Sequence, residues 1–280
     1  MAREKYRFNT RGGRVFDVVN VIVLSAVGII ALIPFIYVIA GSFATEAELA
    51  TRSFFLWPET FSLRAYESIL TSPAFIRALV TTIAVTAVGT AVQLLLTASM
   101  AYPLSKANLP GRRFFLYAVI VTLVFGGGMI PTFLVVKDLG LLDTYWALIL
   151  PLAINPFSLI IIKNFFQQLP GELEESAKID GANEIQTLWR IILPLSLPGL
   201  AVGLPLVFSL TAAAYVTPQI LGGNFSPLLG TLIEQQILTL NDWPFGAAIS
   251  TLLIAMVLAG NLLFLKIVNR RFARWTGGVR

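Results

Sequence analysis

Residues 18–45 read VVNVIVLSAVGIIALIPFIYVIAGSFAT, 28 positions without a charged side chain. An α-helix needs about 20 apolar residues to cross a bilayer core of roughly 30 Å, so this stretch is long enough to span a membrane. A basic segment precedes it, as in a secretory signal peptide, but the apolar core of such a peptide has only about 7–15 residues. The stretch therefore predicts a retained transmembrane anchor.

The composition extends this interpretation to the whole chain of 280 residues. Hydrophobic residues make up 56% of the chain and charged residues only 12%, and the mean hydropathy is +0.80. A soluble domain has roughly a quarter of charged residues, so lipid is the expected solvent here. The net charge of +5 does not indicate a nucleic-acid partner, because the basic residues are scattered between apolar blocks.

The chain contains neither Cys nor His. This excludes disulfides, thiolate nucleophiles, haem ligation, the usual zinc sites and Ser-His or Cys-His catalysis. We therefore expect no intrinsic enzyme activity and no metal site.

Further uncharged stretches follow the first, and one of them, 191–233, is too long for a single span. Pro218, Gly222 and Pro227 break it, so we place a helix at about 191–217 and a loop after it. The fold class is all-α, a polytopic membrane protein. Its six transmembrane helices are predicted at about 18–40, 78–104, 114–136, 144–162, 191–217 and 244–267. Residues 1–17, 163–190 and 268–280 are predicted as an N-terminal segment, a loop and a basic tail.

The basic residues are distributed unevenly over this topology. Sixteen of the 20 lysines and arginines fall on the side that carries both termini and the loop 163–190. By the positive-inside rule, this side is predicted to be cytoplasmic.

No Asp, Glu, Lys or Arg lies inside the six predicted spans. Ion-coupled carriers usually hold an ionisable group in the membrane, so its absence weighs against that class. The phosphate-binding pattern GxxxxGK[ST] is also missing, so we do not expect the chain to hydrolyse nucleotide itself. A passive pore remains an alternative.

Several uncharged polar residues fall at membrane depth. In hydrocarbon each needs a hydrogen-bond partner, so packing between helices explains them, whereas a polar lining for a solute path is the alternative. Both interpretations stay open for Gln93, Asn155, Ser209, Thr211, Tyr215 and Thr217.

A glycine run interrupts the third predicted span. Gly126, Gly127 and Gly128 each lower helix propensity, and Pro131 lacks a backbone donor, so a kink or an unwound turn is expected. The run serves either as a hinge or gate, or as a place where helices pack closely.

An aromatic cluster lies in the outer loop 46–77. Phe54, Phe55 and Trp57 stand among acidic neighbours there, and the loop 221–243 is predicted on the same side. The two loops form either a docking surface for a partner protein or, in the case of the aromatics, an anchor at the lipid headgroups.

The loop at residues 171–194 reads GELEESAKIDGANEIQTLWRIILP. Its acidic start favours a helix N-terminus and predicts a short helix from about Glu172 to Ile179. Gly181 is suited to the left-handed conformation that ends a helix. A second helix is predicted from Ala182, merging into the fifth span after Pro194.

This loop resembles the EAA loop of binding-protein-dependent ABC transporter permeases, with the pattern EAA, two residues, DGA and a later proline. The matching positions are Glu175, Ala177, Asp180, Gly181, Ala182 and Pro194; the departures are Ser176 at the second alanine and Leu188 at the usual phenylalanine. The resemblance implies that these eight residues couple the chain to an ATPase.

Further expectations follow from the same resemblance. It implies a multi-pass permease of the bacterial inner membrane, with both termini in the cytoplasm. It also implies four kinds of neighbour: a second homologous permease subunit, a cytoplasmic ATPase dimer, an extracytoplasmic solute-binding protein and membrane lipid. ATP and magnesium would bind to the ATPase, so no cofactor is expected in this chain.

The likeness within that family changes along the chain. Residues 7–196 are most similar to carbohydrate permeases, as shown by the segments 125–133 and 137–151, whereas 193–200, 215–223 and 242–248 look more like polyamine or ferric-ion permeases. The spans contain no acid to receive a polycation, which favours a saccharide. A polyamine or other small solute is the alternative, and a self-contained channel or ion-coupled carrier is the alternative from another class.

Overall fold

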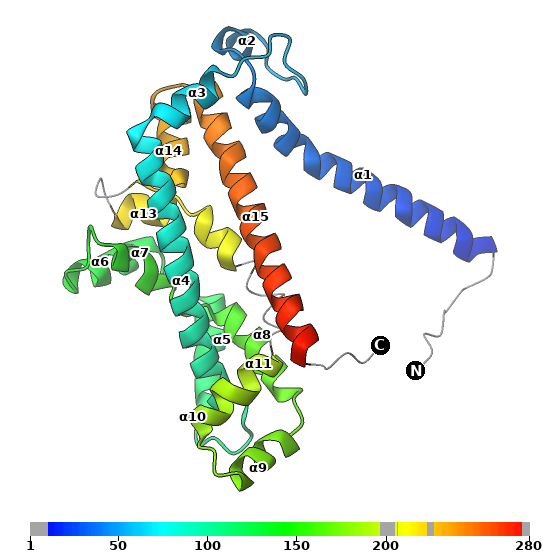
Figure 1. The fold of residues 1–280 in the computed structure, drawn as a ribbon, viewed down its shortest axis with the longest axis vertical. Helices are drawn as coiled ribbons and strands as arrows, with labels where there is room; N and C mark the ends of the chain where they lie inside the picture. The colour runs from blue at the N-terminus through cyan, green and yellow to red at the C-terminus, as the bar shows by residue number, and fades with distance from the viewer. Residues whose placement is uncertain (1–10, 197–204, 206, 223–226, 276–280) are drawn as a thin grey trace.

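A computed structural model of the chain describes residues 11–196, 205, 207–222 and 227–275, and every regular element in these ranges is helical (Figure 1). Three helices are long and apolar enough to cross a membrane: α1 (Arg11–Ser42), α4 (Pro73–Ser105) and α15 (Trp243–Trp275). They confirm the first, second and last predicted spans. Each starts earlier than predicted, and α15 also continues into the predicted basic tail.

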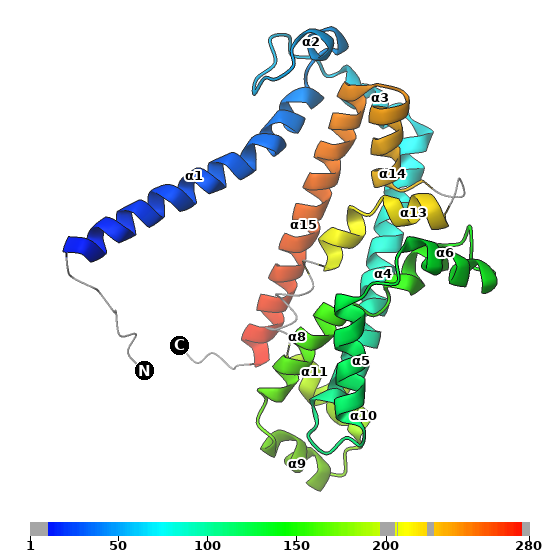
Figure 2. The ribbon, with the colours of Figure 1, turned by 180° about the vertical axis from the view of Figure 1, so that it is seen from behind.

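The molecule is elongated, with α4 and α15 along its length (Figures 1 and 2). One end, which we call the α2 end, carries α2 (Glu46–Thr51) and α3 (Arg64–Thr71). The opposite α9 end carries α9 (Glu172–Ile179) and α10 (Glu184–Thr187).

The third and fourth predicted spans are broken rather than straight. α5 (Arg112–Val124) and α6 (Met129–Asp138) meet at a bend of 116°. This bend lies at the glycine run and confirms the expected interruption, because Gly128 has φ 81° and ψ 171°, a conformation essentially limited to glycine. The helix predicted over 114–136 is therefore two helices at a steep angle.

The fourth span bends at two prolines. α7 (Tyr145–Ile149) runs into a 3-10 turn, η1 (Leu150–Leu152), and α8 (Pro156–Gln167) follows at 52°. Pro156 occupies the first turn of α8, where a missing N–H costs nothing, and the Asn155 side chain accepts a hydrogen bond from the Ser158 N–H as a cap. The described residues thus contain three clear spans, or five when each bent pair is taken as one.

The fifth predicted span, 191–217, lies partly outside the described residues. Its described parts are η2 (Leu188–Ile192, a π-helix), α11 (Leu193–Leu195), a helical stretch at 207–212 and the start of α13 (Val216–Leu221). The prediction of a loop over 221–243 is wrong for residues 229–239. α14 (Leu229–Glu234) and the π-helix η3 (Gln235–Thr239) lie there, because Leu229 and Leu232 are buried in the core.

The core consists of three main clusters arranged along α4. Ala101 of α4 packs with Leu159 and Ile192 toward the α9 end, Ala78 packs toward the α2 end, and Val85 belongs to the cluster between them. All three clusters include α4, so this helix organises the described chain. α1 differs, since none of its most apolar window is buried in the chain and it diverges from α15 (Figures 1 and 2).

The conformation of Gly128 leads to a stability prediction. A side chain at φ 81° is strained by about 1–3 kcal/mol, so Gly128→Ala should lower the apparent melting temperature by several degrees. Gly127→Ala is the matched control, because an added Cβ meets nothing within 4 Å there and φ is not positive. The measurement is thermal unfolding of the purified protein in detergent. Equal melting temperatures for the two variants would contradict the prediction.

Candidate functional site

A cavity of about 520 Å³ lies beside the middle of α4. Its wall includes Gln93 of α4, Gly126 from the α5–α6 break, Asn155 from the α7–α8 break and Thr211 from the helical stretch 207–212. Three of the six predicted path residues and one predicted hinge glycine therefore meet around one space. The two helix breaks form a large part of its wall.

The wall of the cavity is mainly apolar, with a few uncharged polar side chains among its described residues. Gln93 is 8% exposed, the Thr211 hydroxyl donates to the Val207 carbonyl at 2.9 Å, and the Asn155 Oδ1 accepts from the Ser158 N–H at 3.0 Å. Phe157 adds an aromatic ring to the wall. None of the described lining residues carries a charge, so the arrangement suits a neutral solute with hydroxyl groups.

The other three predicted path residues lie elsewhere. Ser209 donates to the Pro205 carbonyl at 2.7 Å and accepts from Asn261 of α15 at 3.0 Å, so it joins two helices as the packing interpretation expects. Tyr215, which is 46% exposed, precedes α13, and Thr217 lies in its first turn. Neither residue is in the described wall of the cavity.

A line of buried threonines on α4 was not predicted. Thr82, Thr86, Thr90 and Thr97 are each at most 6% exposed, and with Gln93 they recur at intervals of three or four residues, which places them on one face of the helix. Thr82 accepts from the Leu229 N–H at 2.8 Å. In the described part of the chain the hydroxyls of Thr90 and Thr97 have no partner. This helical periodicity is the signal from which the line is predictable.

The turn between α9 and α10 is built as the loop sequence predicts. α9 has the expected bounds, and Gly181 is left-handed with φ 80°. The Gly181 N–H donates to the Lys178 carbonyl at 3.1 Å and the Ala182 N–H to the Ala177 carbonyl at 2.9 Å, which is the Schellman pattern. The second helix starts at Glu184 rather than at Ala182, because Asn183 caps it by exchanging hydrogen bonds with Gln186.

The predicted coupling residues divide between two faces. Ala177 is 3% exposed and Leu188 7% exposed, so both support the turn from inside the chain instead of offering a surface; Pro194 and Ala182 are half-buried. The residues exposed to solvent are Glu175, Ser176, Asp180 and Gly181.

Two exposed isoleucines flank the same turn and were missed. Ile179 is 85% exposed and Ile185 is 69% exposed. Their apolar character within a polar loop is the signal that marks them, since large exposed apolar side chains indicate an interaction surface.

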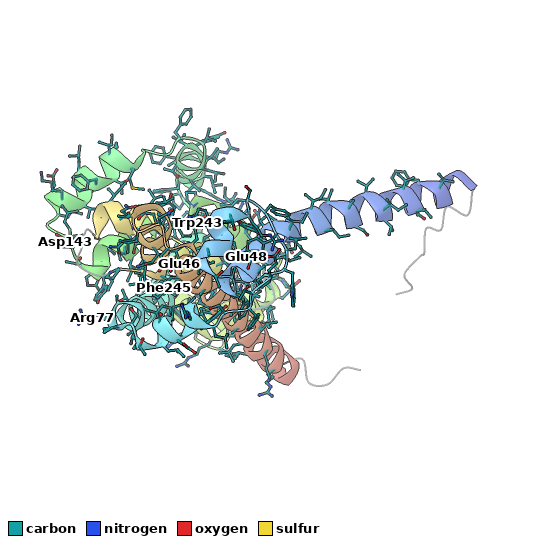
Figure 3. The ribbon with its side chains drawn as sticks, turned by 90° about the horizontal axis from the view of Figure 1, so that it is seen from above. Glu46, Glu48, Arg77, Asp143, Trp243 and Phe245 are labelled. Carbon is teal, nitrogen blue, oxygen red and sulfur yellow. The ribbon has the colours of Figure 1, made fainter. Side chains whose placement is uncertain are left out.

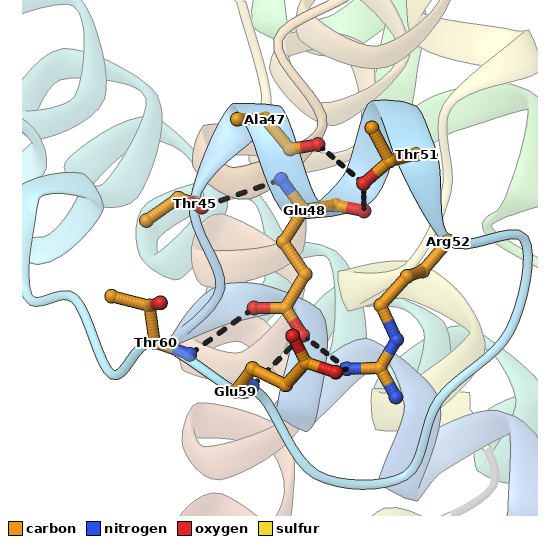
Figure 4. Close-up of polar contacts among 7 residues, drawn as sticks. All are labelled: Thr45, Ala47, Glu48, Thr51, Arg52, Glu59 and Thr60. Atoms are coloured by element: carbon orange, nitrogen blue, oxygen red, sulfur yellow. Dashed lines mark hydrogen bonds and ion pairs between the residues drawn. The ribbon is translucent and has the colours of Figure 1, made fainter.

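The α2 end is ordered by a buried carboxylate, Glu48 (Figure 4). Glu48 accepts from the backbone N–H groups of Glu59 at 2.9 Å and Thr60 at 3.4 Å, and from Arg52 at 2.6 Å. The hydrogen bond from the Glu59 N–H is the main reason that the pKa of Glu48 lies below its ordinary value, and desolvation opposes it. These bonds hold the loop between Arg52 and Thr60.

The three loop aromatics do not form one exposed cluster, which corrects the prediction. Phe55 is 3% exposed and packs against Tyr37 and Ala40. Phe54 stacks on Tyr37 with ring centroids 5.5 Å apart, while Trp57 is 79% exposed. The packing of Phe55 on the end of α1 makes it the inward ring, and sequence spacing does not reveal this.

A second cavity, of about 660 Å³, opens at the α2 end. Glu46, Arg64, Asp242 and Phe245 contribute to its wall. Figure 3 looks onto this end, where Glu46 and Phe245 lie near the start of α15.

A family model for the inner membrane component of binding-protein-dependent transport systems matches residues 1–276. The chain belongs to this family.

Protein LplC of Bacillus subtilis (strain 168) is 63% identical to this permease over 201 residues, which are 72% of the chain and 68% of LplC. The polygalacturonan/rhamnogalacturonan transport system permease protein YtcP of the same organism is 53% identical over 188 residues, 67% of the chain and 66% of YtcP. The chain thus matches about two thirds of the length of each relative.

A solved permease fold is also similar. A chain in the crystal structure of a bacterial ABC transporter involved in the import of the acidic polysaccharide alginate superposes with a TM-score of 0.76 at 29% identity. The match covers 93% of this permease and 98% of that chain, so the helical arrangement described above is shared along nearly the whole length.

The Glu48 anchor leads to a pH prediction for this permease. Because the folded pKa of Glu48 is depressed below 4.5, its stabilisation is fully present above that value and is lost as the pH falls through the lower, folded pKa. Glu48→Gln should therefore lower the exchange protection of the Glu59 and Thr60 amides at pH 7, and wild type should lose protection only in acid. Hydrogen exchange with mass spectrometry measures this. Glu46→Gln, on the exposed side of α2, is the control; equal loss in both variants would refute the anchor.

Proposed function

We propose that this permease is one of two such subunits in an ATP-driven importer and forms part of the path of a saccharide. The observation that carries the proposal is the α9–α10 turn, where a left-handed Gly181 lies within the EAA pattern and Glu175 and Ile179 are exposed beside it. Membership of a family of transport components that depend on a binding protein supports the same conclusion.

The α9 end would dock onto a cytoplasmic ATPase. Ile179 and Ile185 are apolar side chains that a groove on the ATPase would cover, and Glu175 and Asp180 would pair with basic groups at its rim. ATP and magnesium would bind to that subunit, so this chain contributes no cofactor site and no hydrolysis. When the ATPase dimer closes, α9 would move as a rigid body and change the access of the cavity.

The charge distribution supports an orientation with the α9 end in the cytoplasm. Sixteen of the 20 basic residues lie on the side of both termini and of the loop 163–190, and cytoplasmic loops are enriched in Lys and Arg. The permease would then be a multi-pass protein of the bacterial inner membrane with both termini inside.

A second, homologous permease subunit would complete the assembly. The most apolar window of α1 is not buried in the chain, and Figures 1 and 2 show α1 leaving the other helices. Lipid and the second subunit would share this helix surface, and the second subunit would close the solute path.

The α2 end would receive an extracytoplasmic solute-binding protein. Trp57 and Phe54 are the exposed loop aromatics, at 79% and 59%, and Glu48 holds their loop in place. Phe55 is buried and is not part of this surface. The competing explanation for the exposure of Trp57 is that its ring lies among the lipid headgroups.

The neutral wall of the cavity favours a saccharide over a polyamine. A polycation needs carboxylates or an aromatic cage, whereas Gln93, Asn155 and Phe157 offer hydrogen bonds and one aromatic face. YtcP is named for polygalacturonan and rhamnogalacturonan, and the similar solved transporter for the acidic polysaccharide alginate. Both names support a saccharide as the solute class. A self-contained channel or ion-coupled carrier is the competing function.

The turn at Gly181 provides the direct test of coupling. At φ 80° a β-branched side chain is strained by about 1–3 kcal/mol, so Gly181→Val should re-aim α9 and reduce both ATPase retention and ATP-driven uptake in proteoliposomes. Gly181→Asn is the matched control, because Asn tolerates the left-handed region. Full activity of Gly181→Val would refute the coupling role, and uptake driven by an ion gradient without ATP would establish the competing function.

The cavity provides the test of the solute. Gln93→Leu keeps the approximate size of the side chain but removes its hydrogen bonds, so saccharide uptake should fall roughly tenfold, as expected for one lost hydrogen bond. Ser209→Ala is the control, since Ser209 bonds to Asn261 and not to the cavity. Uptake of a labelled neutral oligosaccharide and of spermidine should be compared; spermidine uptake alone would establish the polyamine alternative.

A further inference from the structure

An ion pair links α9 to the end of α4. Lys106 follows the last residue of α4, and its Nζ contacts Oε1 of Glu174 in the first turn of α9, 68 positions later in the chain. The same Nζ lies 4.5 Å from the ring centroid of Tyr102, one turn back on α4. The Lys106 and Glu174 side chains are 34% and 20% exposed, so water screens this pair less than a fully exposed one.

The pair differs from the other ion pairs of the described chain. Arg52 pairs with Glu48 and with Glu59 within a segment of a dozen residues, 48–59, whereas Lys106 and Glu174 are 68 positions apart. Among the described ion pairs, this one alone joins segments that are distant in sequence.

α9 packs only lightly on the remaining described elements. Its inward-facing residues are Leu173, Glu174 and Ala177, of which only Ala177 is fully buried, and Ala177 belongs to none of the core clusters. Glu175 and Ile179 face outward. One face of this short helix is thus exposed and open to a partner. The opposite face lies against the rest of the chain, and Glu174 makes its ion pair there.

The α4 end of the pair is firmly held. The Gln167 side chain at the end of α8 donates to the Ser105 carbonyl at 3.2 Å, and Arg112 at the start of α5 donates to the Leu104 carbonyl at 2.9 Å. Tyr102 lies in the core cluster near this end, edge-on to Phe166. Lys106 therefore extends from a backbone segment that hydrogen bonds join to α5 and α8. Gln93 in the cavity wall lies on the same helix, about 20 Å away at 1.5 Å per residue.

We propose that Lys106 and Glu174 form a positioning pair that transmits the displacement of α9 to α4 and so to the wall of the cavity. This inference rests on the proposed function, in which an ATPase moves α9. Burial and the nearby charge of Lys178 lower the pKa of Lys106, while Glu184 opposes this.

The test compares charge reversal with charge exchange. Lys106→Glu, Glu174→Lys and the double variant are reconstituted with the ATPase and the binding protein, and saccharide imported per ATP hydrolysed is measured. Each single variant should lower this ratio about three- to tenfold while retaining the ATPase, and the exchange should restore it to within about twofold of wild type. Glu172→Lys, with the same charge change on the exposed side of α9, is the matched control and should keep the wild-type ratio.

A second measurement needs only the permease in detergent. Amide exchange of α9 should be faster in each single variant and return to the wild-type rate in the exchanged pair. The inference about the pair would be overturned if the single variants kept the wild-type ratio of saccharide imported to ATP hydrolysed. It would also be overturned if the double variant did not restore a lowered ratio. Either result would leave the importer proposal intact. Loss of the ATPase from the single variants would overturn it too, because the residues would then act in docking. A wild-type permease that retains no ATPase would overturn the proposed function itself, and the inference with it.

Discussion

Backbone polar groups cannot remain unpaired in hydrocarbon, and this constraint explains where the helices of this permease break. At membrane depth, irregular backbone is tolerated only where it is buried in protein or lines a polar space. The breaks at Gly126 and at Asn155 both lie in the wall of one cavity, and the Asn155 side chain satisfies a free N–H at the start of α8. The helix breaks are therefore part of the candidate site. They are tolerated there because the cavity offers their backbone groups surroundings other than lipid.

α4 connects the features that lie far apart. It contributes to the core cluster at each end and between them, carries Gln93 in the cavity wall, and ends at Lys106 beside α9. At the other end, Ser72 caps its first turn and α3 precedes it directly. The ion pair with α9 and the polar residue Gln93 of the cavity wall thus belong to a single helix.

Local signals predicted part of this arrangement, and tertiary contacts decided the rest. Long uncharged stretches were sufficient for α1, α4 and α15, and the acidic start and Gly181 were sufficient for α9, because each signal lies within a few turns of the element that it specifies. The 116° bend after α5 was predictable as an interruption but not as an angle, since the angle depends on what packs around it. The burial of Phe55 and the pairing of Lys106 with Glu174 depend on contacts between distant segments. Residue spacing within one segment therefore does not predict them.

The small side chains of α4 have a mechanical consequence. Thr82, Thr86, Thr90 and Thr97, with Ala98 and Ala101 further along, give one face of this helix mostly small side chains, and Gln93 is the larger exception among them. A Cβ on Gly89 would lie 3.7 Å from Ile149 and 3.8 Å from Thr211, an ordinary van der Waals separation, so these neighbouring segments pack beside this helix without strain. Interdigitated ridges lock helices in register, whereas smooth faces allow small sliding movements between packed helices. A helix of this kind can shift along its neighbours without unpacking them, which is the property that a connection between α9 and the cavity requires.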